Sequence, residues 1–346
     1  MKKILLIGNF CFGEESHNGQ TSKSRDYYYY LSEKYGTENI ILSDTALWRK
    51  NFITSYFSLK KQLKRAENVV MLMGVNAAKY ILPIVVRFKK KYNYRVFWPI
   101  VGGSLLYDKR AQKKLLPLFG GVDSIYFETK IMTEYFSNSG TNVHYAPVFT
   151  KRVLSKQFNP EINHGLLRLC TYSRVCKDKG ITTAIEAVKN INKDCILCTL
   201  DIFGEPCPDY KNEFDEITAG TEKFIFKNGY LNGDKVIDTL SEFDAMLFPT
   251  YYPGEGFPIG VVECLTGGVP VIASDWHYNC EIIQHGKTGF IFDLNNAGGL
   301  EECVYKLLND RELLLEMKKN ALEYSRMFEP HTVLNDLFAE IDKGGE

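Results

Sequence analysis

Apolar segments of strand length recur along the whole chain, and each is followed by a segment of helical length or by a turn. Near-continuous apolar strands that alternate with helices are typical of parallel sheets covered by helices on both faces. Ligands of such sheets bind beyond the carboxyl ends of the strands. The pattern therefore predicts an α/β fold with doubly wound, Rossmann-like sheets. Its strands are expected at 3–10, 39–45, 68–74, 94–101, 124–129, 143–148, 166–174, 196–204, 223–230, 244–250, 270–275 and 288–293.

The two halves of the chain carry opposite charge. At 346 residues the chain is longer than one typical core, which favours two domains. Residues 1–150 hold 22 Lys and Arg against 11 Asp and Glu, so the rest hold 42 − 22 = 20 against 42 − 11 = 31. The aperiodic segment 149–165 lies between the two arrays of predicted strands and is expected to be the linker. We therefore expect domains at 1–150 and 151–329, followed by a helix at 330–346.

The most informative motif is PTYYPGEGFPIGVVECLTGGVPVIASD, residues 249–275. Prolines and glycines break the chain after an apolar strand, and Pro258 suits the first turn of a helix at 259–265. Free N–H groups at the start of a helix attract anions, and phosphate is the most natural of these. The stretch therefore predicts an anion site at a strand-to-helix turn.

Two carboxylates, Glu255 and Glu263, frame this turn. Eight residues at the helical rise correspond to roughly 12 Å, whereas the paired carboxyls of glycosidases lie about 5–9.5 Å apart. This spacing suits two carboxylates that hold hydroxyls at opposite ends of one elongated ligand with phosphate at its centre, such as a sugar nucleotide. The alternative is a surface helix with two solvated glutamates.

Charged side chains also follow an earlier strand, in SRVCKDKG (173–180). Arg174 and Lys179 belong to one strand-to-helix loop and could converge on a phosphate, with Arg as a bidentate fork and Lys as a point charge. The alternative is a pair of exposed loop charges. NGQTSKSR (18–25) offers a further strand-to-helix turn with free N–H groups, for which an ordinary βα turn is the alternative.

These motifs together resemble a known family. Glu255 and Glu263 within GEGFPIGVVECLTGGVPVIASD match the E-x7-E signature of retaining GT-B glycosyltransferases, glycosyltransferase family 4, of the polysaccharide-biosynthesis type. SRVCKDKG is similar to the family's R-x4-K pair, and NGQTSKSR to its phosphate-facing loop. The resemblance is dense in the second half and covers the first half only at 18–25 and in outline.

The resemblance implies two Rossmann-like domains that face each other across a cleft. Residues 1–150 would bind the acceptor, 151–329 would bind the nucleotide sugar, and the helix at 330–346 would cross back to the first domain. The implied reaction is a retaining hexosyl transfer from a nucleotide-diphosphate donor, UDP-sugar in the first place. The acceptor would be a hydroxyl of a glycan or lipid-linked saccharide in surface polysaccharide or glycoconjugate assembly.

The resemblance also implies roles for individual residues. The catalytic group would be Arg174, Lys179 and Glu255. Gly102 and Gly103 lie on the acceptor side, where many members have a histidine, so no catalytic histidine is carried over. The donor-binding residues would be Gly19, Gln20, Thr21, Tyr230, Leu231, Gly256, Phe257, Pro258, Ile259, Gly260 and Glu263.

No metal or other cofactor is expected. The sequence contains no D-x-D motif, its six histidines show no ligand spacing, and its nine cysteines are scattered. The pair Cys195 and Cys198 lies in a predicted buried strand. Positive charge from Arg174, Lys179 and the helix N–H groups would therefore stabilise the leaving diphosphate without a metal ion.

The sequence predicts a cytoplasmic protein with no nucleic-acid partner. No apolar run approaches 18 residues, and the odd number of cysteines favours free thiols in a reducing compartment. The basic helical segment 49–66 could contact an anionic membrane surface, which would place the protein on the inner membrane face. For its aromatic face (Phe52, Tyr56, Leu59 and Leu63) we expect packing on the protein's own sheet instead.

Three other functions are alternatives to this interpretation. A GT-B epimerase or phosphorylase shares the outline but should use different charged motifs. An oxidoreductase that binds a dinucleotide needs G-x-G-x-x-G after the first strand, and GNFCFG does not supply it. A non-catalytic protein that binds sugar nucleotides would keep the fold, and turnover of the donor would distinguish the enzyme from it.

Overall fold

The computed structural model describes residues 3–12, 19–49, 51–161, 164–231, 233 and 235–343. The chain divides into two compact units. Unit 1 comprises Met1–Lys151 and Phe328–Glu346, and unit 2 comprises Arg152–Met327. The chain therefore passes from unit 1 into unit 2 and then returns.

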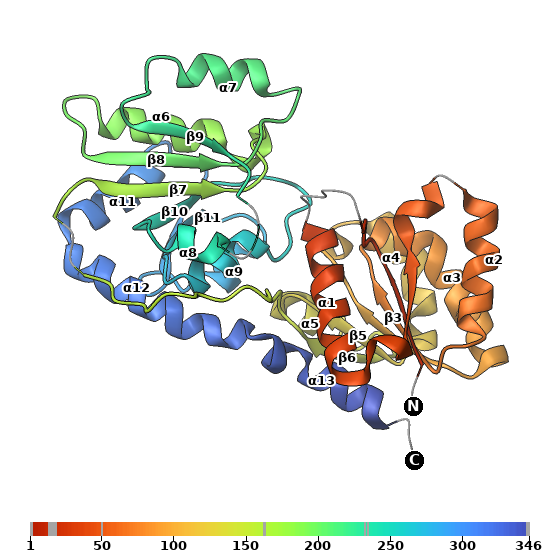
Figure 1. Ribbon diagram of the computed structural model, residues 1–346. Helices are drawn as coiled ribbons and strands as arrows, with labels where there is room; N and C mark the ends of the chain where they lie inside the picture. The colour runs from red at the N-terminus through yellow and green to blue at the C-terminus, as the bar shows by residue number, and fades with distance from the viewer. Residues whose placement is uncertain are drawn as a thin grey trace. The chain divides into compact units, whose positions relative to one another are not determined.

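Unit 1 is built on one parallel sheet of six strands (Figure 1). The strands are β1 (Ile4–Gly8), β2 (Ile40–Asp44), β3 (Asn68–Leu72), β4 (Arg95–Pro99), β5 (Ser124–Phe127) and β6 (Asn142–Tyr145). Their order is β2-β1-β3-β4-β5-β6, and Ile4 is aligned with both Ile40 and Asn68. β1, β3 and β5 are buried along their whole length, as expected for strands covered on both faces.

The last helix of the chain belongs to the core of unit 1. Leu334, Leu337 and Ile341 pack in the same buried cluster as Leu6 and Leu72 of the sheet. The helices of unit 1 are α1 (Gly19–Tyr35), α2 (Phe52–Leu63), α3 (Val75–Tyr92), α4 (Lys109–Leu115), α5 (Lys130–Tyr135) and α13 (Pro330–Lys343). Its 3₁₀ turns are η1 (Thr37–Asn39), η2 (Thr45–Arg49), η3 (Ser104–Leu106) and η4 (Leu116–Gly121).

Unit 2 contains a second parallel sheet of six strands, in the order β12-β11-β10-β7-β8-β9. The strands are β7 (Leu167–Tyr172), β8 (Cys198–Phe203), β9 (Ile225–Gly229), β10 (Ala245–Phe248), β11 (Val271–Ser274) and β12 (Gly289–Phe292). The chain runs outward from β7 to β9 and then returns to the other side of β7 with β10. The strand order therefore reverses between β7 and β10, and in such sheets the ligand binds at the carboxyl ends of the strands next to the reversal.

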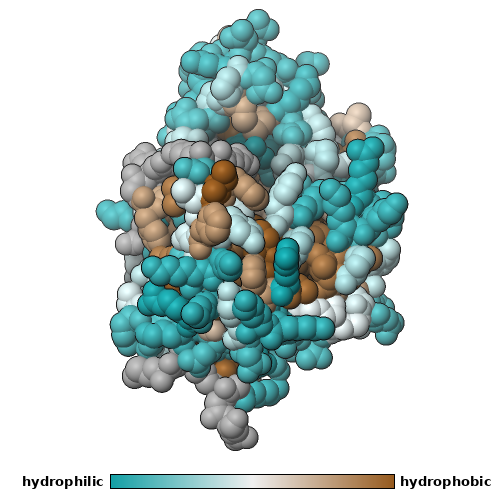
Figure 2. All heavy atoms as spheres, turned by 90° about the vertical axis from the view of Figure 1, so that its right-hand side faces the viewer, coloured by the Kyte–Doolittle hydropathy of each residue, from teal (hydrophilic) through white to brown (hydrophobic). Residues whose placement is uncertain are grey.

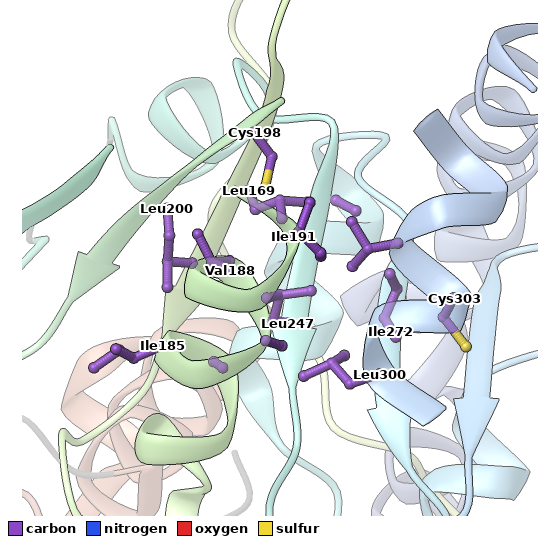
Figure 3. Packing of buried hydrophobic residues seen from close by; sticks show 14 of the residues in the cluster. Leu169, Ile185, Val188, Ile191, Cys198, Leu200, Leu247, Ile272, Leu300 and Cys303 are labelled. Carbon is purple, nitrogen blue, oxygen red and sulfur yellow. The ribbon is translucent and has the colours of Figure 1, made fainter. Parts of the chain in front are cut away.

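Helices cover both faces of this sheet. On one face, Ile185, Val188 and Ile191 of α6 pack with Leu300 and Cys303 of α11 over the strands (Figure 3). On the other face, α9 lies against α8 and α12. The helices of unit 2 are α6 (Ile181–Ile191), α7 (Lys211–Thr218), α8 (Val236–Leu240), α9 (Ile259–Thr266), α10 (Asn279–Ile282), α11 (Gly299–Asn309) and α12 (Arg311–Ser325). Its 3₁₀ turns are η5 (Lys177–Lys179) and η6 (Arg326–Phe328), the latter ending in unit 1.

The strand predictions are confirmed, since each strand of the described chain overlaps a predicted segment. The prediction for the aromatic face of segment 49–66 is only half right. Leu59 and Leu63 are buried, but Phe52 is 56% exposed and Tyr56 is half-buried. The buried residues of α2 lie in its last two turns, so only this half of the helix packs on unit 1. Among the described helices, none combines the length and the apolar character that crossing a bilayer requires.

Candidate functional site

Two loops meet where the strand order of unit 2 reverses. The first follows β7 and contains η5, and the second follows β10 and leads into α9. The Tyr251 N–H donates a hydrogen bond of 2.8 Å to the Asp178 carbonyl and so joins the two loops. The motifs SRVCKDKG and PTYYPGEG are therefore neighbours in space although some 70 residues separate them.

Gly180 allows this close approach. Its φ is +71°, and a Cβ at this position would lie 1.9 Å from the carbonyl oxygen of Pro249. Glycine adopts this left-handed conformation without a steric penalty, and here it also leaves room for the second loop. Gly180 ends η5 and begins α6, so the position of Lys179 depends on it.

Lys179 and Glu255 form a buried ion pair between the loops. The Lys179 Nζ lies 2.5 Å from Glu255 Oε2, and the two side chains are only 9% and 8% exposed. The Thr250 hydroxyl donates a second hydrogen bond of 2.8 Å to the same carboxylate oxygen. A buried carboxylate requires such partners, and together they hold the Glu255 side chain in a fixed position.

Arg174 is exposed and lies near the same pair. Its guanidinium carbon is 5.1 Å from the centre of the Tyr252 ring, and Lys179 Nζ is 5.0 Å from that centre. Both cations of the R-x4-K motif therefore lie next to the Tyr252 ring. Sequence reasoning missed Tyr252 and Thr250. Their position directly after an apolar strand could have indicated them.

The loop after β10 is held by the last residue of β11 and by the loop that follows it. The Ser274 hydroxyl donates to the Thr250 carbonyl at 2.6 Å, and the Trp276 Nε1 donates to the Tyr252 carbonyl at 2.8 Å. A ring nitrogen of His277 lies 3.2 Å from the carbonyl oxygen of Pro253. Burial lowers the pKa of His277, and Glu255 opposes this shift. Sequence reasoning missed the roles of these three residues, because the roles depend on β10 and β11 being neighbours in the sheet.

Helix α9 starts next to the end of β7. Pro258 is the N-cap residue and Ile259 is the first helical residue, so the prediction of a helix that begins at 259, directly after Pro258, is confirmed. A Cβ on Gly260 would lie 2.9 Å from the carbonyl oxygen of Tyr172, so the helix start fits tightly against β7. The opening N–H groups of a helix, here those of Ile259 and Gly260, point away from the helix along its axis. Gly256 and Phe257, just before the helix, are buried.

Glu263, on the same helix, is fully buried. Its Oε1 forms an ion pair with the guanidinium of Arg152, whose side chain is 24% exposed. Burial and a hydrogen bond to the Glu263 carboxylate both raise the pKa of the Tyr172 phenol. The alternative of two solvated glutamates is therefore excluded, since Glu255 and Glu263 are both buried and both paired with cations.

Tyr230 and Leu231 follow the last residue of β9, two strands away from β7 in the sheet. Tyr230 is 48% exposed. Gly204 connects this edge to the site, because its N–H donates to the Gly229 carbonyl at 2.7 Å and a Cβ on it would lie 2.1 Å from the Ser173 carbonyl oxygen. These two residues therefore lie at the same edge of the sheet as Arg174.

The remaining predicted residues lie in unit 1. Gly19, Gln20 and Thr21 open α1, whereas the first residue of the predicted loop, Asn18, lies outside the described residues. Gly102 has a φ of +83°, and it precedes Gly103, the N-cap of η3.

The Gly102 N–H donates to Glu128 Oε2 at 3.1 Å. Glu128 is in turn paired with Lys23 at 2.6 Å, and both side chains are buried. Sequence reasoning missed this pair because 105 residues separate its members.

Comparison with known proteins gives matches over both units. Residues 155–324 match the family model described as Glycosyl transferases group 1. The poly(glycerol-phosphate) alpha-glucosyltransferase of Bacillus subtilis is 24% identical over 247 residues, which make up 68% of this chain and 35% of that protein. The N,N'-diacetylbacillosaminyl-diphospho-undecaprenol alpha-1,3-N-acetylgalactosaminyltransferase of Campylobacter jejuni is 29% identical over 98 residues, 28% of this chain and 26% of that protein. The chain thus spans about a third or less of the length of these relatives.

A solved structure matches nearly the whole chain. Anabaena HepE, in a crystal structure with UDP and glucose, superimposes with a TM-score of 0.74 at 13% sequence identity. The match covers 99% of this chain and 100% of that one. At this identity the likeness shows a shared fold and nothing further.

Proposed function

Because residues 155–324 match the family model described as Glycosyl transferases group 1 and the whole chain has the GT-B fold, we propose that this protein is a retaining glycosyltransferase. It moves a hexosyl group from a UDP-sugar to a hydroxyl of a glycan or lipid-linked saccharide. The proposal rests on one observation. Arg174, the Lys179–Glu255 pair and the start of α9 lie together where the strand order of unit 2 reverses.

The chemical difficulty of this reaction is the negative charge that develops on the departing diphosphate. Arg174 supplies an exposed guanidinium, and the N–H groups of Ile259 and Gly260 supply the positive end of a helix dipole. Lys179 is paired with Glu255, so its charge acts on the phosphate as the donor takes up part of this pairing. The N–H groups at the start of α9 are held in place by the fold, which favours electrostatic stabilisation of the transition state.

Glu255 orients the transferred sugar in this proposal. Its carboxylate is held by Lys179 and Thr250, and it lies in the loop directly before α9. The charged groups described at the site are cations or carboxylates with cationic partners, which suits a reaction without an enzyme nucleophile. The leaving phosphate then acts as the base for an acceptor that attacks on the same face, and the configuration is retained. No metal ion takes part in this mechanism.

The donor is proposed to carry uracil. The structural relative HepE is described with UDP and glucose, and Tyr230 and Leu231 lie at the same strand edge as Arg174 in this chain. Backbone groups near Gly229 would hold the edge of the base, and Glu263 would receive the ribose hydroxyls.

The acceptor is proposed to be linked to a lipid diphosphate and to reach unit 1 near Gly102 and Gly103. Unit 1 holds most of the positive charge, and a lipid carrier occurs in the name of the Campylobacter relative. Leu47, Phe52, Ile53 and Phe57 form an exposed group that we name the α2 patch. Figure 2 shows hydrophobic side chains among hydrophilic ones on the side of unit 1 that carries α2. This patch and the lysines after it would contact the inner membrane face.

A thermal-shift screen of UDP, GDP and ADP with and without EDTA tests the proposal. We expect UDP to stabilise the wild type in EDTA, and Arg174→Ala to lose most of this shift. Arg168→Ala is the matched control, because Arg168 is an exposed arginine of the same unit. If none of the three nucleotides stabilises the wild type, the glycosyltransferase assignment fails.

Turnover then separates the enzyme from a protein that only binds sugar nucleotides. We expect release of UDP from a UDP-sugar when the acceptor is present, and an α-linked product from an α-linked donor by NMR. A β-linked product would contradict retention, and binding without any turnover would favour the non-catalytic alternative.

A further inference from the structure

The carboxylate proposed to receive the ribose of the donor is not accessible in this structure. Glu263 has no exposed surface, and Arg152, which is paired with its Oε1, is 24% exposed. The Tyr172 phenol forms a hydrogen bond with the same carboxylate. A hydroxyl that binds Glu263 therefore has to compete with Arg152 for the carboxylate.

From this geometry we propose that Arg152 is a gate for the donor ribose: it occupies Glu263 while the site is empty, and the ribose hydroxyls displace it. The inference rests on the proposed function, because it assumes that Glu263 binds ribose. It adds a positioning residue that lies outside both charged motifs.

In this exchange the Glu263 carboxylate loses one hydrogen-bonding partner and gains another. A buried carboxylate without a partner is strongly unfavourable, so the empty site requires a cation at Glu263. Two vicinal hydroxyls can donate two hydrogen bonds to one carboxylate and so replace the guanidinium. Arg152 can leave at small cost because its side chain already reaches solvent and because residues 151–154 belong to no helix or strand.

The segment that follows Arg152 is fixed on unit 2. The Ser155 N–H donates to Asp238 at 2.8 Å, and the ring of Phe158 occupies the space where a Cβ on Gly268 would lie. Lys151, on the other side, belongs to unit 1. Displacement of Arg152 therefore increases the mobility of only the few residues at which the chain enters unit 2. Donor binding changes the mobility of this connection.

A pair of ligands isolates the ribose contact. UDP and 2′,3′-dideoxy-UDP differ only in the two hydroxyls, so the ratio of their Kd values measures what the hydroxyls contribute. In Arg152→Ala the hydroxyls no longer compete with a guanidinium, and we expect the preference for UDP over 2′,3′-dideoxy-UDP to rise at least three-fold over wild type. In Glu263→Ala the preference should fall to near one, and in Arg168→Ala it should equal that of wild type.

The opposite results overturn the gate. An unchanged or smaller preference in Arg152→Ala would mean that Arg152 does not compete with ribose. Equal weakening of both ligands would assign Arg152 a merely structural role. If the wild type binds none of UDP, GDP and ADP, the proposed function and the gate fail together. If UDP binds and depends on Arg174 but the preference ignores Arg152, only the gate fails.

Wild-type protein provides a test that does not depend on the folding of a variant. Hydrogen exchange of the amides at 152–154 should become faster on saturation with UDP and stay unchanged on saturation with 2′,3′-dideoxy-UDP. Equal exchange with both ligands would contradict the gate. Arg152→Lys, which keeps a charge without the planar fork, should give a preference between those of wild type and Arg152→Ala.

Discussion

Gly180 is the residue at which the two loops of the site come nearest to each other. Alanine there would have to adopt a φ of +71° and would place its Cβ 1.9 Å from a backbone oxygen. Glycine at this position is therefore required both by the conformation and by the space, and the geometry of the R-x4-K motif follows from it.

Gly180→Ala should lower the free energy of unfolding of unit 2 by about 3 kcal/mol, the sum of left-handed strain and overpacking. Gly220→Ala is the matched control, because Gly220 has a φ of +75° with open space around it. The control should cost only about 1–2 kcal/mol from the strain itself. Urea titration of both variants measures the difference, and equal losses would contradict the role of the clash.

The Lys179–Glu255 pair is a second residue-scale test. Removing one partner leaves a buried charge, so Lys179→Met or Glu255→Gln alone should cost about 3 kcal/mol in the unfolding free energy. The double variant should cost less than the sum, since neither charge remains. Lys177→Met serves as the control, because Lys177 lies in the same loop as Lys179 and its ion pair with Glu213 of α7 is exposed and should contribute little. Additive losses in the cycle would show that the two residues act independently.

At the scale of whole elements, α13 is attached to unit 1 by a continuous apolar stripe. Leu337→Ala removes a fully buried side chain and should destabilise unit 1 by about 2–5 kcal/mol. Lys343→Ala, on the exposed side of the same helix, should leave the unfolding of unit 1 nearly unchanged. Hydrogen exchange resolved by unit would check both, and a loss of protection confined to unit 2 would contradict the packing.

The α2 patch predicts a membrane contact by one helix. Ile53 and Phe57 are 68% and 61% exposed, and Lys61 follows on the same face one turn later. Ile53→Ser with Phe57→Ser should reduce co-sedimentation with vesicles that contain anionic lipid, measured at low salt. Tyr305→Ser, at an exposed aromatic residue of unit 2, is the control. If the wild type does not sediment with such vesicles, the membrane contact is wrong.

Sequence reasoning predicted elements better than it predicted their partners. The strands of both sheets were recognisable because parallel strands buried on both faces are nearly continuous apolar runs. The charged residues of the two motifs were also found. The pairing of Lys179 with Glu255, and of Glu263 with Arg152, was not, because each depends on two segments brought together by the strand order. The exposed half of α2 was missed for the same reason, since helical periodicity does not tell how far a helix extends past its sheet.

At the scale of the whole molecule, the two units should respond separately to the donor nucleotide. The residues assigned to the base, ribose and diphosphate are concentrated in unit 2, apart from the start of α1. UDP at about one hundred times its Kd should therefore stabilise unit 2 by about 2.7 kcal/mol. Hydrogen exchange should show this protection in Arg152–Met327 and little of it in β1 to β6. Equal protection of both units would mean that UDP binding also involves unit 1.

The return of the chain into unit 1 has a consequence for synthesis on the ribosome. Unit 2 is one continuous stretch, so it can fold as soon as residue 327 has left the exit tunnel. Most of unit 1 is translated before unit 2 but still lacks Leu334, Leu337 and Ile341 at that moment. The apolar surface that these residues cover is therefore still exposed. Most of unit 1 is therefore made before unit 2 but completed after it, and in the interval its exposed apolar surface can bind a chaperone.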